Sequence, residues 1–157
     1  MQVLVSDTSV LVDLERGSLL EASFRLPFQF SVPDLLFERE LKNFRGDALL
    51  RLGLVVEELD GDGVALALAY RQRIPSLTIP DSFALALARA REWVLLTGDG
   101  PLRQLAADEA VECRGVLWLL DQIEGKRCVR PVVSAWRDFG HVALQLSLRE
   151  VCCGAPN

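Results

Sequence analysis

The stretch from Trp93 to Arg103 constrains the fold most, because a short apolar run there stops abruptly at a polar turn that carries a carboxylate. Residues 93–96 are rich in strand-forming side chains, and two glycines and a proline follow shortly after them. Such a run is typical of a central parallel strand that is covered on both faces. Ligands of open α/β sheets bind beyond the carboxyl ends of the strands, so Asp99 in this turn is a candidate site residue.

The beginning of the chain repeats this pattern. Residues 2–6 read as a strand, and Asp7 follows with the hydroxyl groups of Thr8 and Ser9 beside it. A helical run over residues 10–15 comes next. Two predicted strands therefore each end at an aspartate close to a hydroxyl group.

Strand and helix patterns alternate along the rest of the chain, which predicts an α/β fold whose parallel sheet has helices on both faces. The predicted strands cover residues 28–32, 54–59 and 111–113. The predicted helices cover residues 35–44, 64–73 after a turn at 61–63, 82–91, 102–107, 115–123, 131–139 and 141–151. At 157 residues and 50% hydrophobic content the chain can bury one sizeable core. We therefore predict a single domain over residues 1–157, in which residues 141–157 form a C-terminal helix and tail.

Cysteine content, charge and hydropathy limit the class of protein. Cys113, Cys128, Cys152 and Cys153 form no C-x-x-C pair, and the lone His141 cannot complete a zinc site with them. The chain shows no signal-peptide pattern and no apolar run as long as a membrane span, so we expect a cytoplasmic protein with reduced thiols. A net charge of −5 and a pI near 4.9 argue against nucleic-acid binding through a broadly basic surface.

Two further acids lie in helices that follow connections from the predicted sheet. Glu38 and Glu40 are two residues apart in one helix and therefore point roughly 200° apart, so one of them can face a shared site. Glu40 lies nearer the apolar stripe of that helix, and we favour it over Glu38. Asp81 belongs to a Thr-x-x-Asp capping box that opens the alanine-rich helix. A cap there stabilises a helix by about 0.5–2 kcal/mol, and this role is an alternative to a site role for Asp81.

The four acids Asp7, Glu40, Asp81 and Asp99 form a set of hard oxygen ligands if the fold brings them together. No histidine or cysteine cluster accompanies them, so the set indicates Mg²⁺ or Mn²⁺ rather than zinc. Carboxylates that share a partly desolvated site repel one another, and a divalent cation neutralises that charge.

Four motifs together resemble the PIN-domain family: Asp-Thr-Ser after the first strand, Val-Pro leading to Glu-Leu, Pro-Asp opening an alanine-rich helix, and Leu-Thr-Gly-Asp after a late strand. Residues 115–120 also resemble a helix of a subgroup of bacterial PIN proteins. The resemblance implies a three-layer α/β/α fold with a central, mostly parallel sheet. It also implies a metal-dependent ribonuclease, often the toxin of a toxin–antitoxin pair. By the family pattern the catalytic and metal-binding residues are Asp7, Glu40, Asp81 and Asp99, surrounded by the hydroxyl groups of Thr8, Ser9 and Thr97.

The implied reaction is hydrolysis of an RNA phosphodiester, in which Mg²⁺ or Mn²⁺ activates a water and polarises the phosphate. Arg39, Lys42 and Arg103 lie near the acids in sequence and are candidates for phosphate contacts, although solvated helix faces are their alternative use. The resemblance also implies a small basic antitoxin-like partner, for which the acidic pI is suitable. We expect a homodimer, with Trp118, Trp136 and Phe139 available for a contact or for burial in the core.

Two other classes with aspartates at strand ends do not fit. A receiver domain needs an acid pair after the first strand and a late lysine, and an Asp-x-Asp phosphatase needs an acid where this chain has Ser9. The serious alternative is an inactive interaction module that keeps the PIN fold and binds protein or RNA.

Overall fold

The structure is a computed structural model that describes residues 1–125. The predictions for the basic run 126–130, the helices 131–139 and 141–151, the tail after them, and the side chains Cys128, Trp136, Phe139, His141, Cys152 and Cys153 lie outside the described residues. No helix within residues 1–125 is long and apolar enough to cross a membrane.

The described residues build a five-stranded sheet in which every pairing is parallel. The strand order is β3-β2-β1-β4-β5, so the chain builds outward from β1 through β2 to β3 and then crosses back to add β4 and β5 on the other side of β1. The strands are β1 (Gln2–Ser6), β2 (Phe28–Pro33), β3 (Val55–Glu57), β4 (Val94–Leu96) and β5 (Cys113–Arg114).

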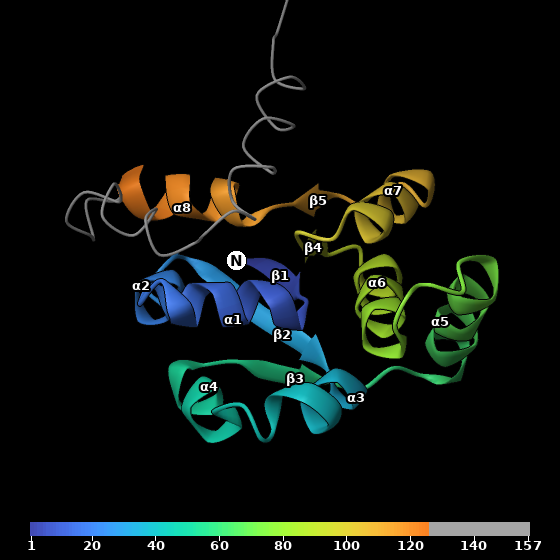
Figure 1. Cartoon of the computed structure of the whole chain (residues 1–157), viewed down its shortest axis with the longest axis horizontal. Helices are drawn as coiled ribbons and strands as arrows, with labels where there is room; N and C mark the ends of the chain where they lie inside the picture. The colour runs from blue at the N-terminus through green and yellow to red at the C-terminus, as the bar shows by residue number, and fades with distance from the viewer. Residues whose placement is uncertain (126–157) are drawn as a thin grey trace, which may run out of the picture.

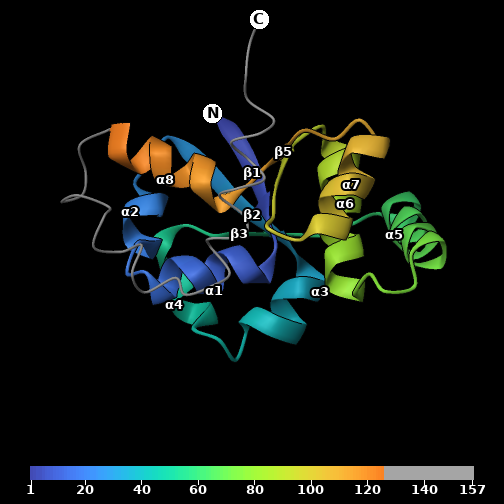
Figure 2. The same cartoon turned by 45° about the horizontal axis from the view of Figure 1, so that its top comes forward.

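Helices cover both faces of this sheet, which gives the three-layer α/β/α arrangement expected from the sequence (Figure 1). The turned view in Figure 2 likewise places α5, α6 and α7 on one side of the sheet and α1, α2 and α8 on the other. The helices are α1 (Thr8–Arg16), α2 (Leu20–Phe24), α3 (Asp34–Leu36), the π-helical turn η1 (Phe37–Leu41), α4 (Gly46–Leu52), α5 (Gly61–Arg73), α6 (Ile79–Arg91), α7 (Gly100–Asp108) and α8 (Val116–Gly125).

Helix α6 is the centre of one helical layer, because it packs against β1, β2 and β4 and also against α3, α5 and α7. Every residue from Ser82 to Ala88 is buried. Alanine at alternate positions of this segment lets the helix backbone lie close to the sheet without a loss of helix propensity. This packing fixes the start of α6, where Asp81 lies, relative to the ends of β1 and β4.

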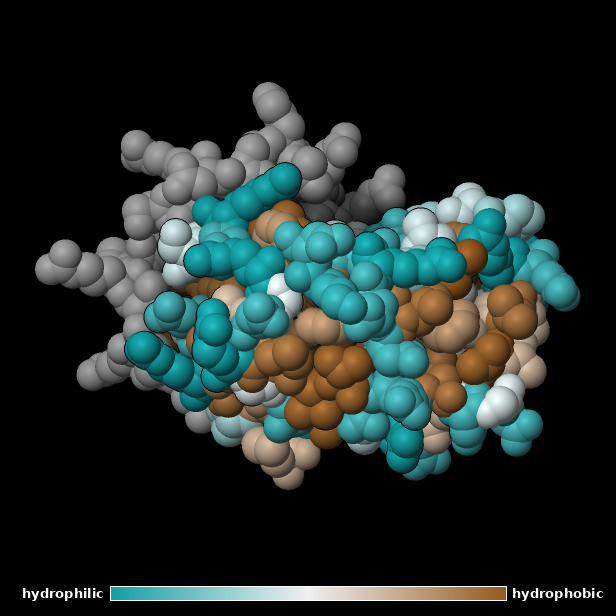
Figure 3. All heavy atoms as spheres, turned by 90° about the horizontal axis from the view of Figure 1, so that it is seen from below, coloured by the Kyte–Doolittle hydropathy of each residue, from teal (hydrophilic) through white to brown (hydrophobic). Residues whose placement is uncertain are grey.

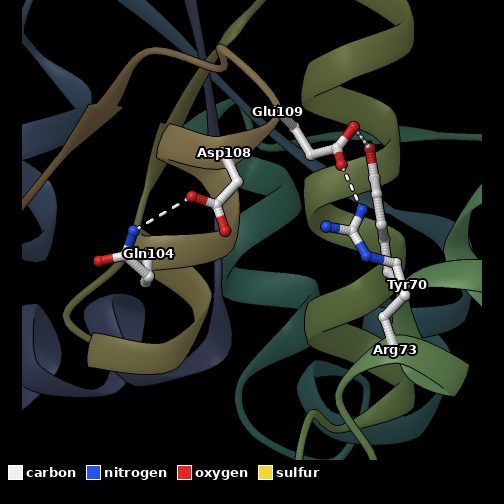
Figure 4. Close-up of polar contacts among 5 residues, drawn as sticks. All are labelled: Tyr70, Arg73, Gln104, Asp108 and Glu109. Carbon is white, nitrogen blue, oxygen red and sulfur yellow. Dashed lines mark hydrogen bonds and ion pairs between the residues drawn. The ribbon is translucent and has the colours of Figure 1, made fainter.

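A polar network holds α7 against α5 (Figure 4). The hydroxyl of the buried Tyr70 donates to Glu109 at 3.1 Å, and Arg73 pairs with the other oxygen of Glu109 at 2.5 Å. Burial, followed by the Glu109 carboxylate, raises the pKa of Tyr70 to about 12, so the phenol stays a donor. Within α7 itself, Gln104 donates to Asp108 at 3.2 Å. The network anchors the helix whose first turn follows Asp99.

The structure corrects several predicted boundaries. The expected turn at 61–63 is the first turn of α5, because Asp60 caps that helix by accepting from the Gly63 amide at 2.8 Å. The edge strand comprises Cys113 and Arg114 rather than residues 111–113. The predicted helix 35–44 ends at Leu41 and finishes as a π-helical turn.

Two short helices were absent from the sequence prediction. Helix α2 has five residues and no side-chain cap, so the sequence carries no start signal for it. Helix α4 likewise begins without a side-chain cap, after a residue in the left-handed conformation. It ends at Gly53, whose φ of 107° suits a helix C-terminus, and this glycine was the available signal.

Candidate active site

The site lies where the strand order reverses, between the carboxyl ends of β1 and β4. The two strands pair as far as Ser6 and Leu96, and the amide of Asp7 extends the pairing by donating to the Leu96 carbonyl at 3.1 Å. The residues that follow each strand therefore meet at one edge, although they are far apart in the chain.

Asp7 is almost completely buried, with 2% of its surface exposed. It is the N-cap of α1, and its Oδ1 accepts from the Val10 amide at 2.9 Å. Its Oδ2 accepts a hydrogen bond from the hydroxyl of Thr97, which is itself fully buried. Both carboxylate oxygens are therefore held in fixed directions.

The electrostatics of Asp7 differ from those of a surface aspartate. Burial raises its pKa from 3.8 to about 6, and the charge of Asp81 adds to this rise. The hydrogen bonds from Thr97, from the Val10 amide and from Ser9 act in the opposite direction. A cation that approaches this buried carboxylate stabilises its charged form and therefore lowers its pKa.

Thr97 links the two strand ends. Its hydroxyl donates to Asp7 and accepts from the Asp99 amide at 3.1 Å. Asp99 is exposed and caps α7, where its Oδ2 accepts from the Leu102 amide at 2.8 Å. Asp7 and Asp99 are thus both helix N-caps at strand ends, a role that was not predicted from the sequence.

Asp81 is half-buried in the first turn of α6 and interacts electrostatically with the other three acids. Burial is the main cause that raises its pKa, and the charges of Asp99 and Glu40 raise it further. Asp81 in turn raises the pKa of Asp7. The fold therefore brings Asp7, Glu40, Asp81 and Asp99 into one electrostatically coupled group.

The π-helical turn η1 presents Glu40 to the site. The wide turn is closed by the Lys42 amide, which donates to the Phe37 carbonyl five residues back at 2.8 Å. Glu40 accepts a hydrogen bond from the hydroxyl of Thr8, the residue after Asp7. Glu38 is exposed and pairs with Lys42 at 2.6 Å, so the contacts favour Glu40 over Glu38 as the fourth acid.

The predicted phosphate-contacting cations have different surroundings. Lys42 and Arg39 are exposed, and Lys42 forms the ion pair with Glu38. Arg103 is half-exposed in α7, one turn beyond Asp99, whose carbonyl accepts from the Arg103 amide at 3.0 Å. Arg103 therefore lies in the first turn of the helix that Asp99 caps.

The donor chemistry of the four acids fits a hard divalent cation, since all the ligand atoms are carboxylate oxygens next to hydroxyl groups. No three acidic, histidine or cysteine side chains within residues 1–125 converge closely enough to hold a metal ion in the conformation observed. The threonine hydroxyls bond the carboxylates of Asp7, Glu40 and Asp81. A carboxylate oxygen that accepts a hydroxyl group keeps a second lone pair for a cation, so cation binding requires these acids to move closer to one another while the hydroxyl bonds remain.

A surface cavity lies elsewhere on the described part of the chain. It has a volume of about 260 Å³ and is lined by the end of α6, the start of β4 and the segment before β5, including Arg89, Trp93 and Glu112. This is the amino end of β4, opposite to the edge where the acids gather. We regard the coupled acids, not this cavity, as the candidate active site.

The chain is similar to several known proteins. The family model DUF3368, described as a PIN domain, matches residues 3–139. A PilT N-terminus domain protein from the archaeon Sulfolobus solfataricus P2 is 16% identical and has a TM-score of 0.52, with 78% of this chain and 93% of that chain covered. A toxin–antitoxin complex from Klebsiella pneumoniae is 20% identical over 61% of this chain and 86% of that chain, with a TM-score of 0.44. A search of curated proteins finds no match.

Proposed function

Because the chain belongs to the PIN-domain family, we propose that it is a metal-dependent ribonuclease that hydrolyses RNA phosphodiester bonds with Mg²⁺ or Mn²⁺. The observation that carries this proposal is the placement of Asp7 and Asp99 at neighbouring strand ends, where the Thr97 hydroxyl bridges them, with Asp81 close enough to the other acids to be repelled by their charges. These acids come from four separate segments of the chain, and Asp7 and Asp99 follow the neighbouring strands β1 and β4 at the place where α/β sheets bind ligands. A cluster of like charges at such a place is destabilising unless a cation joins it.

The residues of the chain have distinct tasks in this proposal. Asp7, Glu40, Asp81 and Asp99 would hold the cation, and Thr8, Ser9 and Thr97 would fix the carboxylates by donating hydrogen bonds. When bound, Mg²⁺ or Mn²⁺ supplies an activated water and polarises the scissile phosphate. No side chain of the group needs to act as a nucleophile.

Few basic side chains lie near the acids to contact an RNA substrate. Arg103, Arg39 and Lys42 are the candidates for phosphate contacts, and the net charge of −5 means that the rest of the surface does little to attract RNA. The bound cation therefore provides much of the attraction for the scissile phosphate. This predicts weak binding of RNA when the cation has been removed.

The decisive experiment is an RNA-cleavage assay with purified full-length protein. We expect cleavage with Mg²⁺ or Mn²⁺ that stops when EDTA is added, and a loss of about 100-fold or more in Asp99→Asn. Asparagine preserves the shape of Asp99 and its helix cap while removing the charge. Asp60→Asn makes the same change at the cap of α5 and should cleave like the wild type.

The main alternative is an inactive PIN-fold module that binds protein or RNA. Wild-type protein that cleaves none of a broad panel of structured and unstructured RNAs would favour the module. Cleavage by Asp99→Asn at the wild-type rate would contradict the site assignment even if the protein is a ribonuclease.

We further propose that the protein is the toxin of a toxin–antitoxin pair and that its partner is a small basic protein. An acidic chain with four coupled carboxylates suits a cationic segment, since a guanidinium can pair with a carboxylate in place of a metal ion. This pairing would block the site. The support is the family membership and the charge of the site.

We also propose a homodimer. Leu50, Val55 and Leu68 are large apolar side chains exposed on the described part of the chain, and Figure 3 shows apolar surface among the polar residues on one face. Trp118 is half-buried: its ring packs against Phe28 at 5.4 Å between centroids, and the guanidinium of Arg114 lies over it at 5.6 Å from the ring centroid. Size-exclusion chromatography with light scattering tests this: a monomer at micromolar concentration would contradict it.

A further inference from the structure

The threonine at the start of α6 makes two hydrogen bonds with the same residue. The Oγ1 of Thr78 accepts from the Asp81 amide at 3.2 Å, as an N-cap does. The same hydroxyl donates to the Oδ2 of Asp81 at 2.6 Å. The cap therefore binds both the backbone and the carboxylate of an acid that belongs to the candidate site.

The backbone around Asp81 is fixed, so its side-chain orientation is the remaining freedom. Pro80 and Ser82 on either side of it are buried, and Ser82 bonds back to the Ile79 carbonyl at 2.7 Å. The carboxylate is half-buried and close enough to Asp99 and Glu40 to be repelled by both. Repulsion favours rotation toward solvent, and the hydroxyl of Thr78 opposes it.

The same arrangement recurs for two other acids of the group. Thr97 donates to Asp7, and Thr8 donates to Glu40. In the described residues, three of the four acids are thus held by threonine hydroxyls. Thr78 completes this pattern from outside the Asp-Thr-Ser and Thr-Gly-Asp motifs.

We propose that Thr78 is a positioning residue for cation binding: its hydroxyl keeps the Asp81 carboxylate turned toward Asp7, Glu40 and Asp99. This inference rests on the proposed function, because it assumes that the acids bind a divalent cation. The hydroxyl does not contact the substrate, and its effect is exerted through Asp81. Removing the hydroxyl should therefore weaken cation binding more than the loss of a helix cap explains.

The test measures Mn²⁺ binding to the full-length protein by isothermal titration calorimetry after EDTA treatment. We expect Thr78→Ala to bind Mn²⁺ about tenfold more weakly, which corresponds to ~1.4 kcal/mol. Thr78→Ser keeps the hydroxyl and should bind like the wild type. Asp60→Ala removes the cap of α5 in the same way as Thr78→Ala removes that of α6, and should lower the melting temperature similarly without a change in Mn²⁺ affinity.

The outcomes separate this inference from the proposed function. If Thr78→Ala binds Mn²⁺ as tightly as the wild type, or if Asp60→Ala weakens binding equally, Thr78 is a cap alone and the inference is wrong. If the wild type binds no Mn²⁺, both the inference and the proposed function fail. Should Thr78→Ala not fold, Thr78→Gly removes the same hydroxyl at a smaller cost in cap stability and must show the same loss of affinity.

Discussion

At the scale of single residues, each candidate carboxylate is held by a nearby donor. Asp7 and Asp99 accept amide hydrogen bonds as helix caps, while Glu40 and Asp81 accept from threonine hydroxyls. Capping explains why Asp7 stays in a buried position whose desolvation raises its pKa, because part of the cost is offset by the bonds to Val10 and Thr97. The carboxylates of the site thus have hydrogen-bond donors, yet burial and mutual repulsion still disfavour their charged forms.

The raised pKa of Asp7 predicts how the stability of the metal-free fold depends on pH. The folded state, with a pKa of about 6, holds the proton more tightly than the unfolded state at 3.8. The resulting stability is fully present below pH 3.8 and is lost as the pH rises through about 6. A shift of this size costs on the order of 3 kcal/mol above that pH.

Asp7→Asn removes this cost, because asparagine is neutral at both pH values. In EDTA we expect the variant to have a larger free energy of unfolding than the wild type at pH 7.5, by ~1–3 kcal/mol, and a similar one near pH 3.5, below the pKa of the unfolded state. Urea denaturation at the two pH values measures this. Asp60→Asn is the control: it changes another helix cap, and its free energy of unfolding should show no such gain at pH 7.5. If Asp7→Asn is less stable than the wild type at pH 7.5, ionised Asp7 does not destabilise the fold.

At the scale of elements, the π-helical turn η1 determines which glutamate faces the site. It turns Glu40 toward Thr8 and leaves Glu38 to pair with Lys42 at the surface. π-helical turns of this kind occur frequently at functional sites. The turn is followed closely by Gly46, the first residue of α4, which packs beneath it.

The orientation of η1 predicts opposite results for its two glutamates. Glu40→Gln removes a charge from the acid group, and we expect a loss of cleavage of ~100-fold. Glu38→Gln breaks an exposed ion pair that contributes little, so cleavage should stay within about twofold of the wild type. Initial cleavage rates at saturating Mg²⁺ decide between them, and the reverse order of the two variants would assign the fourth acid to Glu38.

The packing under η1 predicts that Gly46 cannot carry a side chain. A Cβ there would lie 3.0 Å from the Leu41 carbonyl oxygen and 3.1 Å from the Phe37 ring. Gly46→Ala should therefore lower the free energy of unfolding by ~1–2 kcal/mol. Gly61→Ala, in the first turn of α5 with open space around it, is the matched control and should be neutral or slightly stabilising. Equal stabilities of the two variants in thermal melts would refute the close packing.

At the scale of the whole molecule, the negative charge of the chain opposes the approach of the proposed RNA substrate to the site. The chain carries a net charge of −5, and its acids gather at the edge of the sheet that RNA would have to approach. Such a field repels polyanions and attracts cations. Cleavage would then depend on the metal ion, and inhibition on a basic partner.

This charge distribution predicts how an antitoxin-like partner binds. We expect a small basic protein encoded next to this chain to form a complex on co-expression and to stop RNA cleavage. Its association rate should fall as salt is raised from 50 to 500 mM, because the encounter is steered by opposite charges. Size-exclusion chromatography and stopped-flow mixing measure both effects. A neighbour that neither binds nor inhibits, with a chain that is harmless when expressed alone, would contradict the toxin proposal.

The sequence by itself determined the features that depend on short stretches of chain. Apolar runs that stop at Asp7 and Asp99 specified two strand ends, and the alternation of patterns specified the α/β fold. The Thr-x-x-Asp box correctly identified the cap of α6 at Thr78, although the predicted helix 82–91 begins three residues after the observed start at Ile79. These signals are readable because propensity, capping and burial periodicity act over a few neighbouring residues.

The tertiary structure alone decided which side chains meet. Thr97 reaches Asp7 across 90 positions and Thr8 reaches Glu40 across 32, and both contacts follow from the strand order, which no local pattern encodes. The apolar stripe already favoured Glu40 over Glu38, but the contact of Glu40 with Thr8 depends on a π-helical turn that has no signature in the sequence. The short helices α2 and α4 escaped prediction because neither begins with a side-chain cap, and helices this short depend on tertiary packing.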